Sequence, residues 1–293
     1  MDRRQAIVVR FHSNMLDVID NQTRKRYTCT LRGKFKKQGI RPIVGDIVEY
    51  IGFQDMKGRI EKILPRKNEL DRPKIANIDQ VILVLTVSHP PISLLTLDKF
   101  LIMAEFRDIE SVLVFNKMDL LNQQEKQEQR RLIEYYSRHY TTIQTSAKTG
   151  EGIDLLKRIF NGKTSTLAGM SGVGKSSLLN AVEPGLKLKE GVLSQQLERG
   201  KHTTTYTELL MIGESGLIAD TPGFAFLDLT NFKEDSIRFL MPDLMNYSPE
   251  CSFENCSHID EPDCAVKDAV HTGDILTSRY EDYLKVIEEI GNE

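Results

Sequence analysis

The sequence predicts a multidomain α/β protein that consists of an N-terminal β-barrel, a central parallel sheet covered by helices, and a helical C-terminal module. Three observations support this fold class. Residues 1–64 contain short alternating apolar runs, residues 75–228 alternate strand-like with helix-like runs, and residues 229–293 contain three of the four cysteines. Residues 65–74 carry two prolines and no periodicity, and we interpret them as a linker.

The barrel is predicted from five short runs that are separated by turn residues and basic clusters: AIVVRF, MLDVID, YTCTL, GDIVEYI and GRIEKIL. Short strands of this kind are typical of a small antiparallel barrel. Residues 1–74 contain 18 Lys and Arg against 9 Asp and Glu, whereas residues 229–293 contain 5 against 15. The basic half of this asymmetry favours a nucleic-acid partner, and a solvated basic face is the alternative.

No run of the sequence is suited to crossing a membrane. The longest apolar run, VILVLTV at 81–87, is far shorter than the ~20 residues that a spanning helix needs. The N-terminus, MDRRQAIVVRF, lacks the apolar core of a signal peptide. We therefore expect a cytoplasmic chain with reduced cysteines and no membrane partner. We also expect a monomer, although no motif specifies the oligomeric state.

The central region begins with the strand-like runs IDQVILVLTV and SVLVF, each followed by an amphipathic helical run, LTLDKFLIMAEF and EKQEQRRLIEYYSRHY. After the strand-like STLA, residues 169–176 read GMSGVGKS, which matches G-x-x-x-x-G-K-[ST] and leads into the helix-like SLLNAV. Backbone N–H groups of such a loop wrap phosphates at a helix N-terminus. We expect Lys175 to reach the β- and γ-phosphates and Ser176 to ligate Mg²⁺. The residues expected to line the phosphates are Gly169, Met170, Ser171, Gly172, Val173, Gly174, Lys175, Ser176 and Ser177.

The sequence NKMD at 116–119 predicts which base is bound. It follows the strand-like SVLVF, and ligands collect at the carboxyl ends of strands in open α/β sheets. The Asp119 carboxylate can accept hydrogen bonds from the N1–H and N2–H₂ groups of guanine, a donor pair that adenine lacks. We therefore expect Asn116, Lys117 and Asp119 to bind guanine. The tripeptide SAK, which is Ser146, Ala147 and Lys148, is expected beside the base, with the Ala147 N–H donating to guanine O6.

Two further motifs are typical of the magnesium site and the γ-phosphate contact. The sequence DTPG at 220–223 ends the strand-like GLIA, so Asp220 would hold Mg²⁺ through water and the Gly223 N–H would contact the γ-phosphate. The threonines of GKHTTT at 200–205 would supply a second magnesium ligand, and a polar loop is the alternative. Among Thr203, Thr204 and Thr205 we favour Thr204.

The catalytic machinery differs from that of many nucleotide hydrolases. Where a Gln often follows the glycine of DxxG and orients the attacking water, this sequence has Phe224, which predicts slow intrinsic hydrolysis. His202 is a candidate for positioning water, alongside Lys175 and Thr204 as catalytic candidates. A surface histidine without a catalytic role, or a group supplied by a partner, is the alternative for His202.

The base motif and SAK precede the phosphate loop, whereas the usual order is the reverse. This order is that of a nucleotide domain that has been cut and rejoined, a circular permutation. Because chain termini of a domain often lie close together, such a change leaves the strand ends converging on one face. We therefore expect one intact site.

A metal site is predicted near the C-terminus from the pattern C-x₄-C-x-H-x₅-C. Cys251, Cys256, His258 and Cys264 supply three thiolates and one imidazole, a complete tetrahedral set for one structural zinc ion. Unligated core cysteines are the alternative. Cys29 lies far away in the barrel sequence and is expected to pack as a small apolar residue.

Taken together, these motifs resemble the RsgA family, the circularly permuted GTPases that act on the small ribosomal subunit. The resemblance covers essentially the full length and rests on NKMD, GMSGVGKS, KHTTT, DTPGF, RGKFKK at 32–37 and the Cys/His pattern. It implies an OB-fold barrel that contacts rRNA, and a GTPase that depends on the small (30S) subunit and works in its late maturation. A GTP-regulated RNA-binding module with little turnover, and a hydrolase that acts on another RNA, remain the alternatives.

The RGKFKK sequence is the predicted point of RNA attachment. Arg32, Lys34, Lys36 and Lys37 place four cations within six residues, which suits a phosphate backbone. Phe35 among them could stack on a base. A solvated loop is the alternative.

Overall fold

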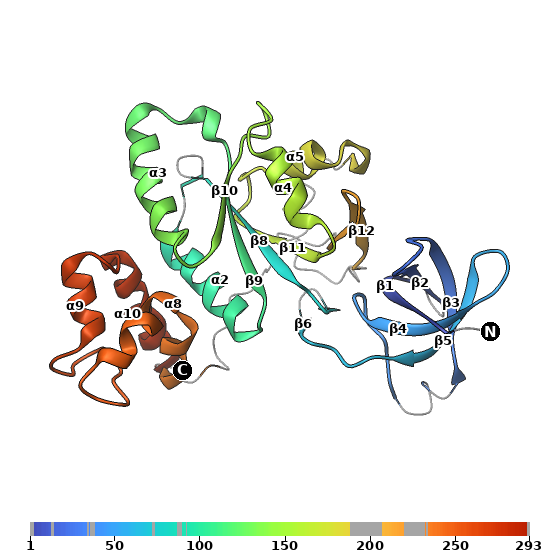
Figure 1. The fold of residues 1–293 in the computed structure, drawn as a ribbon, viewed down its shortest axis with the longest axis horizontal. Helices are drawn as coiled ribbons and strands as arrows, with labels where there is room; N and C mark the ends of the chain where they lie inside the picture. The colour runs from blue at the N-terminus through green and yellow to red at the C-terminus, as the bar shows by residue number, and fades with distance from the viewer. Residues whose placement is uncertain are drawn as a thin grey trace.

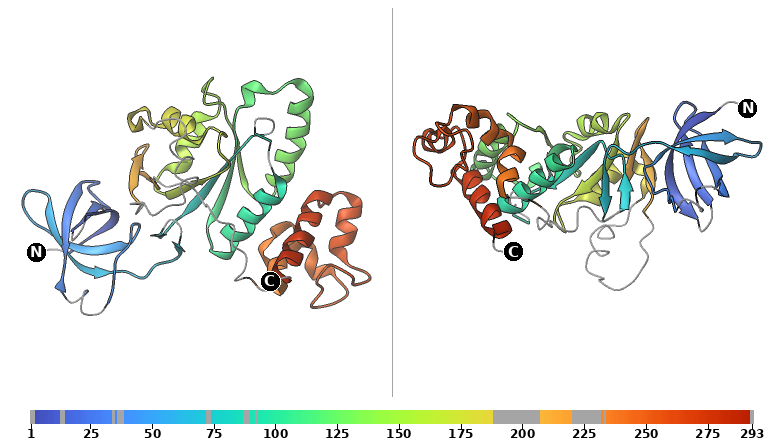
Figure 2. Two further views of the ribbon diagram at one scale, coloured as in Figure 1. Left: turned by 180° about the vertical axis from the view of Figure 1, so that it is seen from behind. Right: turned by 90° about the horizontal axis from the view of Figure 1, so that it is seen from below.

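The computed structural model describes residues 3–12, 15–33, 35, 39–71, 74–86, 90–91, 93–187, 207–219, 232 and 234–291. Figures 1 and 2 show three parts in a row: the N-terminal barrel at one end, the α/β sheet in the middle, and the helical C-terminal module at the other end. No helix in the described ranges is long and apolar enough to cross a membrane.

The barrel has the five strands expected from the sequence, closed in the order β1-β2-β3-β5-β4. They are β1 Arg4–His12, β2 Met15–Asp20, β3 Arg26–Leu31, β4 Ile47–Gly52 and β5 Lys57–Ile63. The expected antiparallel pairing is correct for every neighbouring pair except β3 and β5, which are parallel. Because five strands cannot alternate direction all the way round a closed ring, one pair must be parallel.

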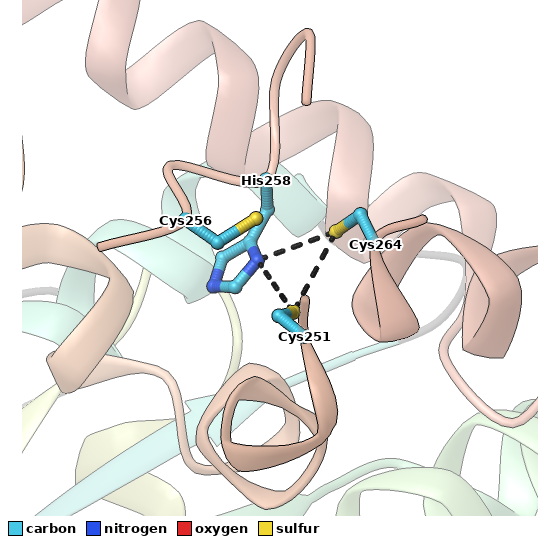
Figure 3. Close-up of side chains that lie close together, drawn as sticks. All are labelled: Cys251, Cys256, His258 and Cys264. Atoms are coloured by element: carbon cyan, nitrogen blue, oxygen red, sulfur yellow. Dashed lines mark hydrogen bonds between the residues drawn. The ribbon is translucent and has the colours of Figure 1, made fainter. Parts of the chain in front are cut away.

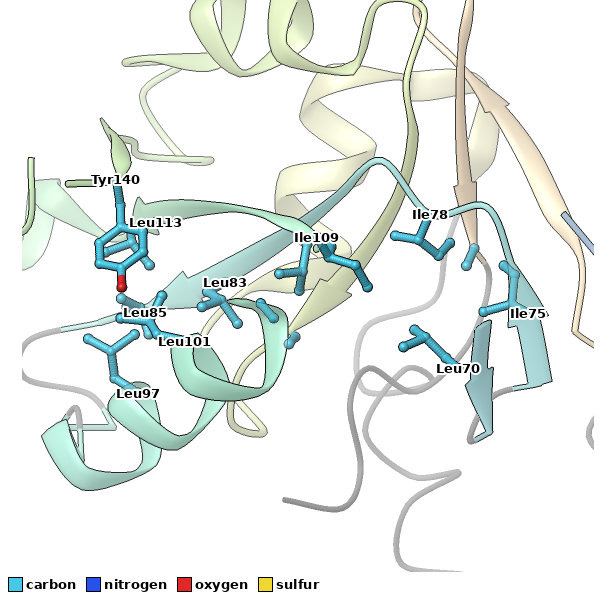
Figure 4. Packing of buried hydrophobic residues seen from close by; sticks show 14 of the residues in the cluster. Leu70, Ile75, Ile78, Leu83, Leu85, Leu97, Leu101, Ile109, Leu113 and Tyr140 are labelled. Carbon is cyan, nitrogen blue, oxygen red and sulfur yellow. The ribbon is translucent and has the colours of Figure 1, made fainter. Parts of the chain in front are cut away.

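The segment interpreted as a linker overlaps a small hairpin that extends two residues beyond it, β6 Glu69–Asp71 paired antiparallel with β7 Lys74–Ala76. Leu70 and Ile75 are buried in it, beside Ile78 (Figure 4). Arg66 Nε donates to Asp46 Oδ1 of the barrel at 2.6 Å. The described residues of this segment therefore form regular structure, which the sequence did not predict because the two strands are too short to show a period.

The central sheet has the strand order β10-β9-β8-β11-β13-β12, and among its described strands only the edge pair β12 and β13 is antiparallel. The strands are β8 Gln80–Leu85, β9 Glu110–Phe115, β10 Thr141–Gln144, β11 Thr164–Ala168, β12 Leu209–Ile212 and β13 Gly216–Ala219. The parallel sheet that the alternating runs predicted is confirmed, with one antiparallel edge strand added.

Helices cover both faces of the sheet. They are α2 Leu94–Phe106, α3 Gln123–Tyr136, α4 Ile153–Phe160 and α5 Lys175–Val182, with the 3₁₀ turns η1 Met118–Leu120 and η2 Pro184–Leu186. On β8, Leu83 and Leu85 pack with α2 (Figure 4) and α3. Ile82 and Val84 pack with α4 and α5. Because successive strand residues point to opposite faces, a continuous apolar run is what a sheet buried on both sides requires.

The C-terminal module consists of short helices and one long one. They are α7 Glu234–Ile237, η3 Arg238–Leu240, α8 Pro242–Tyr247, η4 Ser248–Glu250, α9 Ala265–Thr272 and α10 Thr277–Gly291. The module packs on α2, whose Ile102 and Met103 belong to its core. The fully buried Arg279 of α10 lies 2.6 Å from Asp98 of α2 and 2.8 Å from Asp243 of α8, so an ion cluster seals this contact.

Candidate functional site

The predicted nucleotide-binding motifs meet at one edge of the sheet. NKMD follows β9, SAK follows β10, and the phosphate loop joins β11 to α5, so all three lie at carboxyl ends of parallel strands. Asn116 Nδ2 donates to the Val173 carbonyl oxygen at 2.8 Å, which joins the base motif to the phosphate loop. The base motif therefore precedes the loop in the chain but adjoins it in space, as circular permutation predicts.

Glycine is required at two positions of the phosphate loop. Gly169 has φ +138°, and a Cβ there would lie 2.3 Å from the Val84 carbonyl oxygen. Gly174 has φ +95°, and a Cβ there would lie 2.5 Å from Asn116 Nδ2. Without side chains at these positions, the loop passes close to β8 and to the base motif. The loop leads into the N-terminus of α5, where backbone N–H groups attract anions.

The Lys175 side chain is buried inside the loop that it is expected to serve. Its Nζ donates to the carbonyl oxygens of Gly169 and Met170, both at 2.8 Å. Burial lowers the pKa of Lys175 to about 8. Since an ammonium has three N–H donors, a phosphate can bind this cation and stabilise its charged form.

The remaining loop residues divide into an exposed tip and a buried base. Met170, Ser171 and Gly172 are exposed, while Val173 packs in the core between sheet and α5. Ser176, the predicted magnesium ligand, is buried in the first turn of α5, and Ser177 beside it is half-buried. Val173 therefore anchors a loop whose tip stays open to a ligand.

The base motif is oriented by its own hydrogen bonds. The Ser146 hydroxyl donates to Asp119 Oδ1 at 2.6 Å and accepts from the Thr149 N–H at 3.1 Å. Ser146 is buried while Asp119 is exposed, so the carboxylate is held at the mouth of the site. Ala147 is half-buried beside it, and Lys117 adopts a left-handed backbone with φ +63°. This arrangement holds the carboxylate that the sequence predicts to accept the two guanine donors.

Other predicted residues of the nucleotide site lie outside the described residues: His202, Thr203, Thr204, Thr205, Asp220, Gly223 and Phe224. Strand β13 ends at Ala219, directly before Asp220. Lys148 is described and exposed.

The predicted metal ligands are brought together in the C-terminal module (Figure 3). The ligand atoms of Cys251, Cys256, His258 and Cys264 all lie within 4.8 Å of one another. The Sγ atoms of Cys251 and Cys264 are 3.9 Å apart, and they lie 3.6 and 3.4 Å from His258 Nδ1. Zinc with bonds of about 2.3 Å to sulfur and about 2.0 Å to nitrogen gives tetrahedral edges of about 3.8 and 3.5 Å. The four residues fit a zinc ion.

A neighbouring serine fixes the tautomer of the histidine ligand. Ser248 Oγ lies 3.0 Å from His258 Nε2 and 3.0 Å from the Leu244 carbonyl oxygen. Because that carbonyl can only accept, the hydroxyl hydrogen points to it, and the Ser248 oxygen accepts from Nε2–H. The lone pair of Nδ1 is then directed at the metal position.

Hydrogen bonds from α10 and from within the loop itself hold the loop that connects the metal ligands. Tyr280 donates to the His258 carbonyl oxygen and Tyr283 to that of Ser257, both at 2.6 Å. Glu261 accepts hydrogen bonds from two loop N–H groups. Sequence reasoning missed Ser248, Glu261 and both tyrosines, because only the ligands themselves form a recognisable spacing.

Comparison with known sequences decides the family. The sequence model of the RsgA GTPase matches residues 63–230, and that of the RsgA N-terminal domain matches residues 6–60. The chain belongs to the RsgA GTPase family. It is therefore a GTPase.

Relatives match this RsgA family member over nearly its whole length. Small ribosomal subunit biogenesis GTPase RsgA of Thermotoga petrophila is 49% identical over 288 residues, 98% of this chain and 97% of the relative. The protein of the same name from Agathobacter rectalis is 41% identical over 268 residues, 91% of this chain and 88% of the relative.

Solved structures agree with the fold of this RsgA family member. The crystal structure of YjeQ from Thermotoga maritima has a TM-score of 0.89, with 46% identity and full coverage of both chains. The structure of YloQ, described as a circularly permuted GTPase, has a TM-score of 0.86 and 35% identity, and the match covers 99% of this chain and 96% of that one.

The predicted RNA patch of the barrel needs one correction. Lys34, Lys36 and Lys37 lie outside the described residues. Phe35 is only 4% exposed and packs in the barrel core, so the expectation that its ring is available to stack on a base is wrong. Burying an aromatic ring is more favourable than leaving it in solvent. Arg32 is exposed and donates to Glu61 at 2.5 Å.

Proposed function

We propose that this chain is a Mg²⁺-dependent GTPase that binds the small (30S) ribosomal subunit, hydrolyses GTP during late maturation of the subunit, and is stimulated by it. The observation that supports guanine-nucleotide binding best is the Asn116 to Val173 hydrogen bond, which joins the base motif to the phosphate loop. The proposed partner comes from the relatives, which carry the name small ribosomal subunit biogenesis GTPase.

In this proposal each described residue has a defined part. The Asp119 carboxylate, held by Ser146, accepts the guanine donors. Lys175 moves its hydrogen bonds from the loop carbonyls to the phosphates. Ser176 holds Mg²⁺, which neutralises charge on the phosphates when bound. Thr204, Asp220 and Gly223 keep the parts that the sequence motifs predict, and His202 remains a prediction for positioning water.

The two outer parts of the chain serve the ribosomal partner. We propose that the basic barrel contacts rRNA and that the C-terminal module is held by one structural zinc ion on Cys251, Cys256, His258 and Cys264. Zinc with four protein ligands has no open position for water, so this site would fold the module rather than catalyse. We further propose that the chain acts as a monomer in the cytoplasm, where its subunit partner is made.

GTP turnover with and without purified small subunits tests this proposal. We expect slow turnover by the chain alone, strong stimulation by small subunits, and loss of activity when Mg²⁺ is chelated. Absence of measurable turnover in either condition would favour a GTP-regulated RNA-binding module. Equal stimulation by an unrelated RNA would favour a hydrolase that acts on another RNA.

A further inference from the structure

The barrel and the nucleotide domain meet where the β12–β13 hairpin faces β1 (Figures 1 and 2). Glu208, the residue directly before β12, binds two arginines of the barrel. Arg26 NH2 lies 2.9 Å from Glu208 Oε1, and Arg10 NH1 lies 3.5 Å from Glu208 Oε2. One carboxylate of the nucleotide domain thus occupies two cations of the barrel.

One of these two arginines, Arg26, is also held from within the barrel. Arg26 NH2 lies 3.1 Å from Asp17 Oδ2, and Asp17 accepts hydrogen bonds from His12 at 2.9 Å and Thr28 at 2.9 Å. Burial would raise the pKa of Asp17, but these hydrogen bonds and the charge of Arg26 together hold it below its usual value. Arg26 therefore keeps its position on the barrel whether or not Glu208 is bound.

The barrel holds the other end of the same hairpin through a hydrogen bond to an uncharged acceptor. Arg24 NH2 donates to the Ser215 carbonyl oxygen at 2.8 Å, and Ser215 lies in the turn between β12 and β13. Of these two contacts between described residues, the one at Glu208 pairs full charges. At that contact an added anion can take the place of the Glu208 carboxylate.

Both arginines remain accessible. The side chains of Arg10 and Arg26 are 44% and 47% exposed, whereas that of Glu208 is 21% exposed. A guanidinium binds a phosphate through parallel N–H donors as it binds a carboxylate. Because residues 1–74 carry twice as many basic as acidic side chains, this edge favours an anionic partner. We take that partner to be a nucleic-acid phosphate, since the barrel is proposed to contact rRNA.

We propose that an RNA phosphate competes with Glu208 for Arg10 and Arg26. When RNA binds at this edge, the barrel then holds the β12–β13 hairpin less tightly. The inference rests on the proposed function, because it takes RNA as the partner of the barrel. Its consequence reaches the nucleotide site: β12 pairs with β13, and β13 ends directly before Asp220.

The test measures the affinity of the full chain for purified small subunits and for protein-free rRNA of the small subunit. Glu208→Gln removes the competing charge and keeps the size of the side chain. We expect it to raise both affinities about two- to tenfold, the effect of one or two exposed ion pairs. Glu214→Gln, the same charge change at an exposed position in the turn of the same hairpin, should have no effect.

The double variant Arg10→Gln/Arg26→Gln should weaken binding and reduce its salt dependence, because fewer phosphates are neutralised. In that background Glu208→Gln should change the affinity less than twofold. Unchanged or lower affinity of Glu208→Gln in the native background overturns the inference, as does an equal gain in Glu214→Gln. A gain with subunits but not with rRNA overturns it in favour of an acidic protein segment. Failure of the native chain to bind subunits would instead contradict the proposed function.

Discussion

Asn116 Nδ2 donates to the carbonyl oxygen of Val173 at 2.8 Å across 57 positions of the chain. The amide is oriented by Thr145 Oγ1, which donates to Asn116 Oδ1 at 3.2 Å. Since the oxygen accepts from Thr145, the nitrogen must face the phosphate loop. The side chain therefore joins the base motif to the phosphate loop. We predict that it couples base recognition to phosphate binding, whatever the order in which the chain supplies the two motifs.

Replacing Asn116 with Ala should weaken the binding of both GTP and GDP about tenfold or more. The Val173 carbonyl loses its donor, and an unsatisfied buried polar group costs about 1–3 kcal/mol. Titration calorimetry with both nucleotides measures the effect. Asn122→Ala is a matched control, because Asn122 caps α3 and its loss should lower stability without changing nucleotide affinity. Native nucleotide affinity in Asn116→Ala would contradict the coupling.

Asp119 should decide which base is bound. Asp119→Asn replaces an acceptor for the guanine N2–H₂ group with an amide, which can pair with the carbonyl of xanthine. We expect lower affinity for GTP and higher affinity for xanthosine triphosphate, measured by competition against a fluorescent nucleotide. Ser146→Ala should give a smaller loss for GTP, because it removes only the hydroxyl that orients the carboxylate. Equal affinity of the native chain for ATP and GTP would refute the assignment.

Nucleotide binding should take up protons near pH 8. Burial gives Lys175 a pKa of about 8, and a bound phosphate raises that pKa by stabilising the ammonium. At pH 8 the free chain is therefore about half protonated at Lys175, and the complex fully so, which predicts an uptake of about half a proton per nucleotide. Affinity should accordingly fall as the pH rises above 8.

Calorimetry in two buffers of different ionisation enthalpy measures this uptake. Lys175→Met should abolish it, while Lys157→Met, at an exposed position of α4, should leave it unchanged. Proton release on binding, or uptake that survives in Lys175→Met, would show that another group titrates.

The zinc site should depend on Ser248 although Ser248 is not a ligand. Elemental analysis should find about one zinc per chain, and Cys256→Ser or Cys264→Ser should lose it. Ser248→Ala removes the acceptor that fixes the His258 tautomer and should lower zinc affinity about 10–100-fold in a chelator competition. Cys29→Ala, in the barrel core, should keep full zinc content. Native affinity in Ser248→Ala would reject this role.

The fold was predictable wherever the pattern of the chain repeats. β8 and β9 are read as strands because their runs are apolar on both faces, and the five barrel strands because turn residues separate them. The parallel β3–β5 pair follows only once closure of an odd ring is known. The β6–β7 hairpin could not be predicted from the sequence, since two strands of three residues each are too short to show a period.

The site was predictable only where a motif fixes backbone and spacing together. The phosphate loop, NKMD and the metal ligands meet this condition. Phe35 does not, because a single aromatic among cations gives no sign of which way it faces, and the structure buries it. Ser248 and Arg279 were missed because their parts depend on residues that are distant in sequence and close only in the folded chain.

Arg279 should be essential for the attachment of the C-terminal module. It is fully buried between Asp98 and Asp243, and Tyr136 and Tyr135 donate to these carboxylates at 2.7 and 2.6 Å. Arg279→Met would leave two buried carboxylates without their cation, and breaking a buried ion pair in this way costs about 3–5 kcal/mol. Urea unfolding followed by a probe in the module should show this loss of stability.

Adding Asp98→Asn and Asp243→Asn to Arg279→Met should restore much of the lost stability, because neutral amides do not need a cation. Glu288→Gln, a charge change at an exposed position of α10, should have little effect. A small loss in Arg279→Met, or no recovery in the triple variant, would mean that apolar packing between α2 and α10 holds the module, rather than the ion cluster.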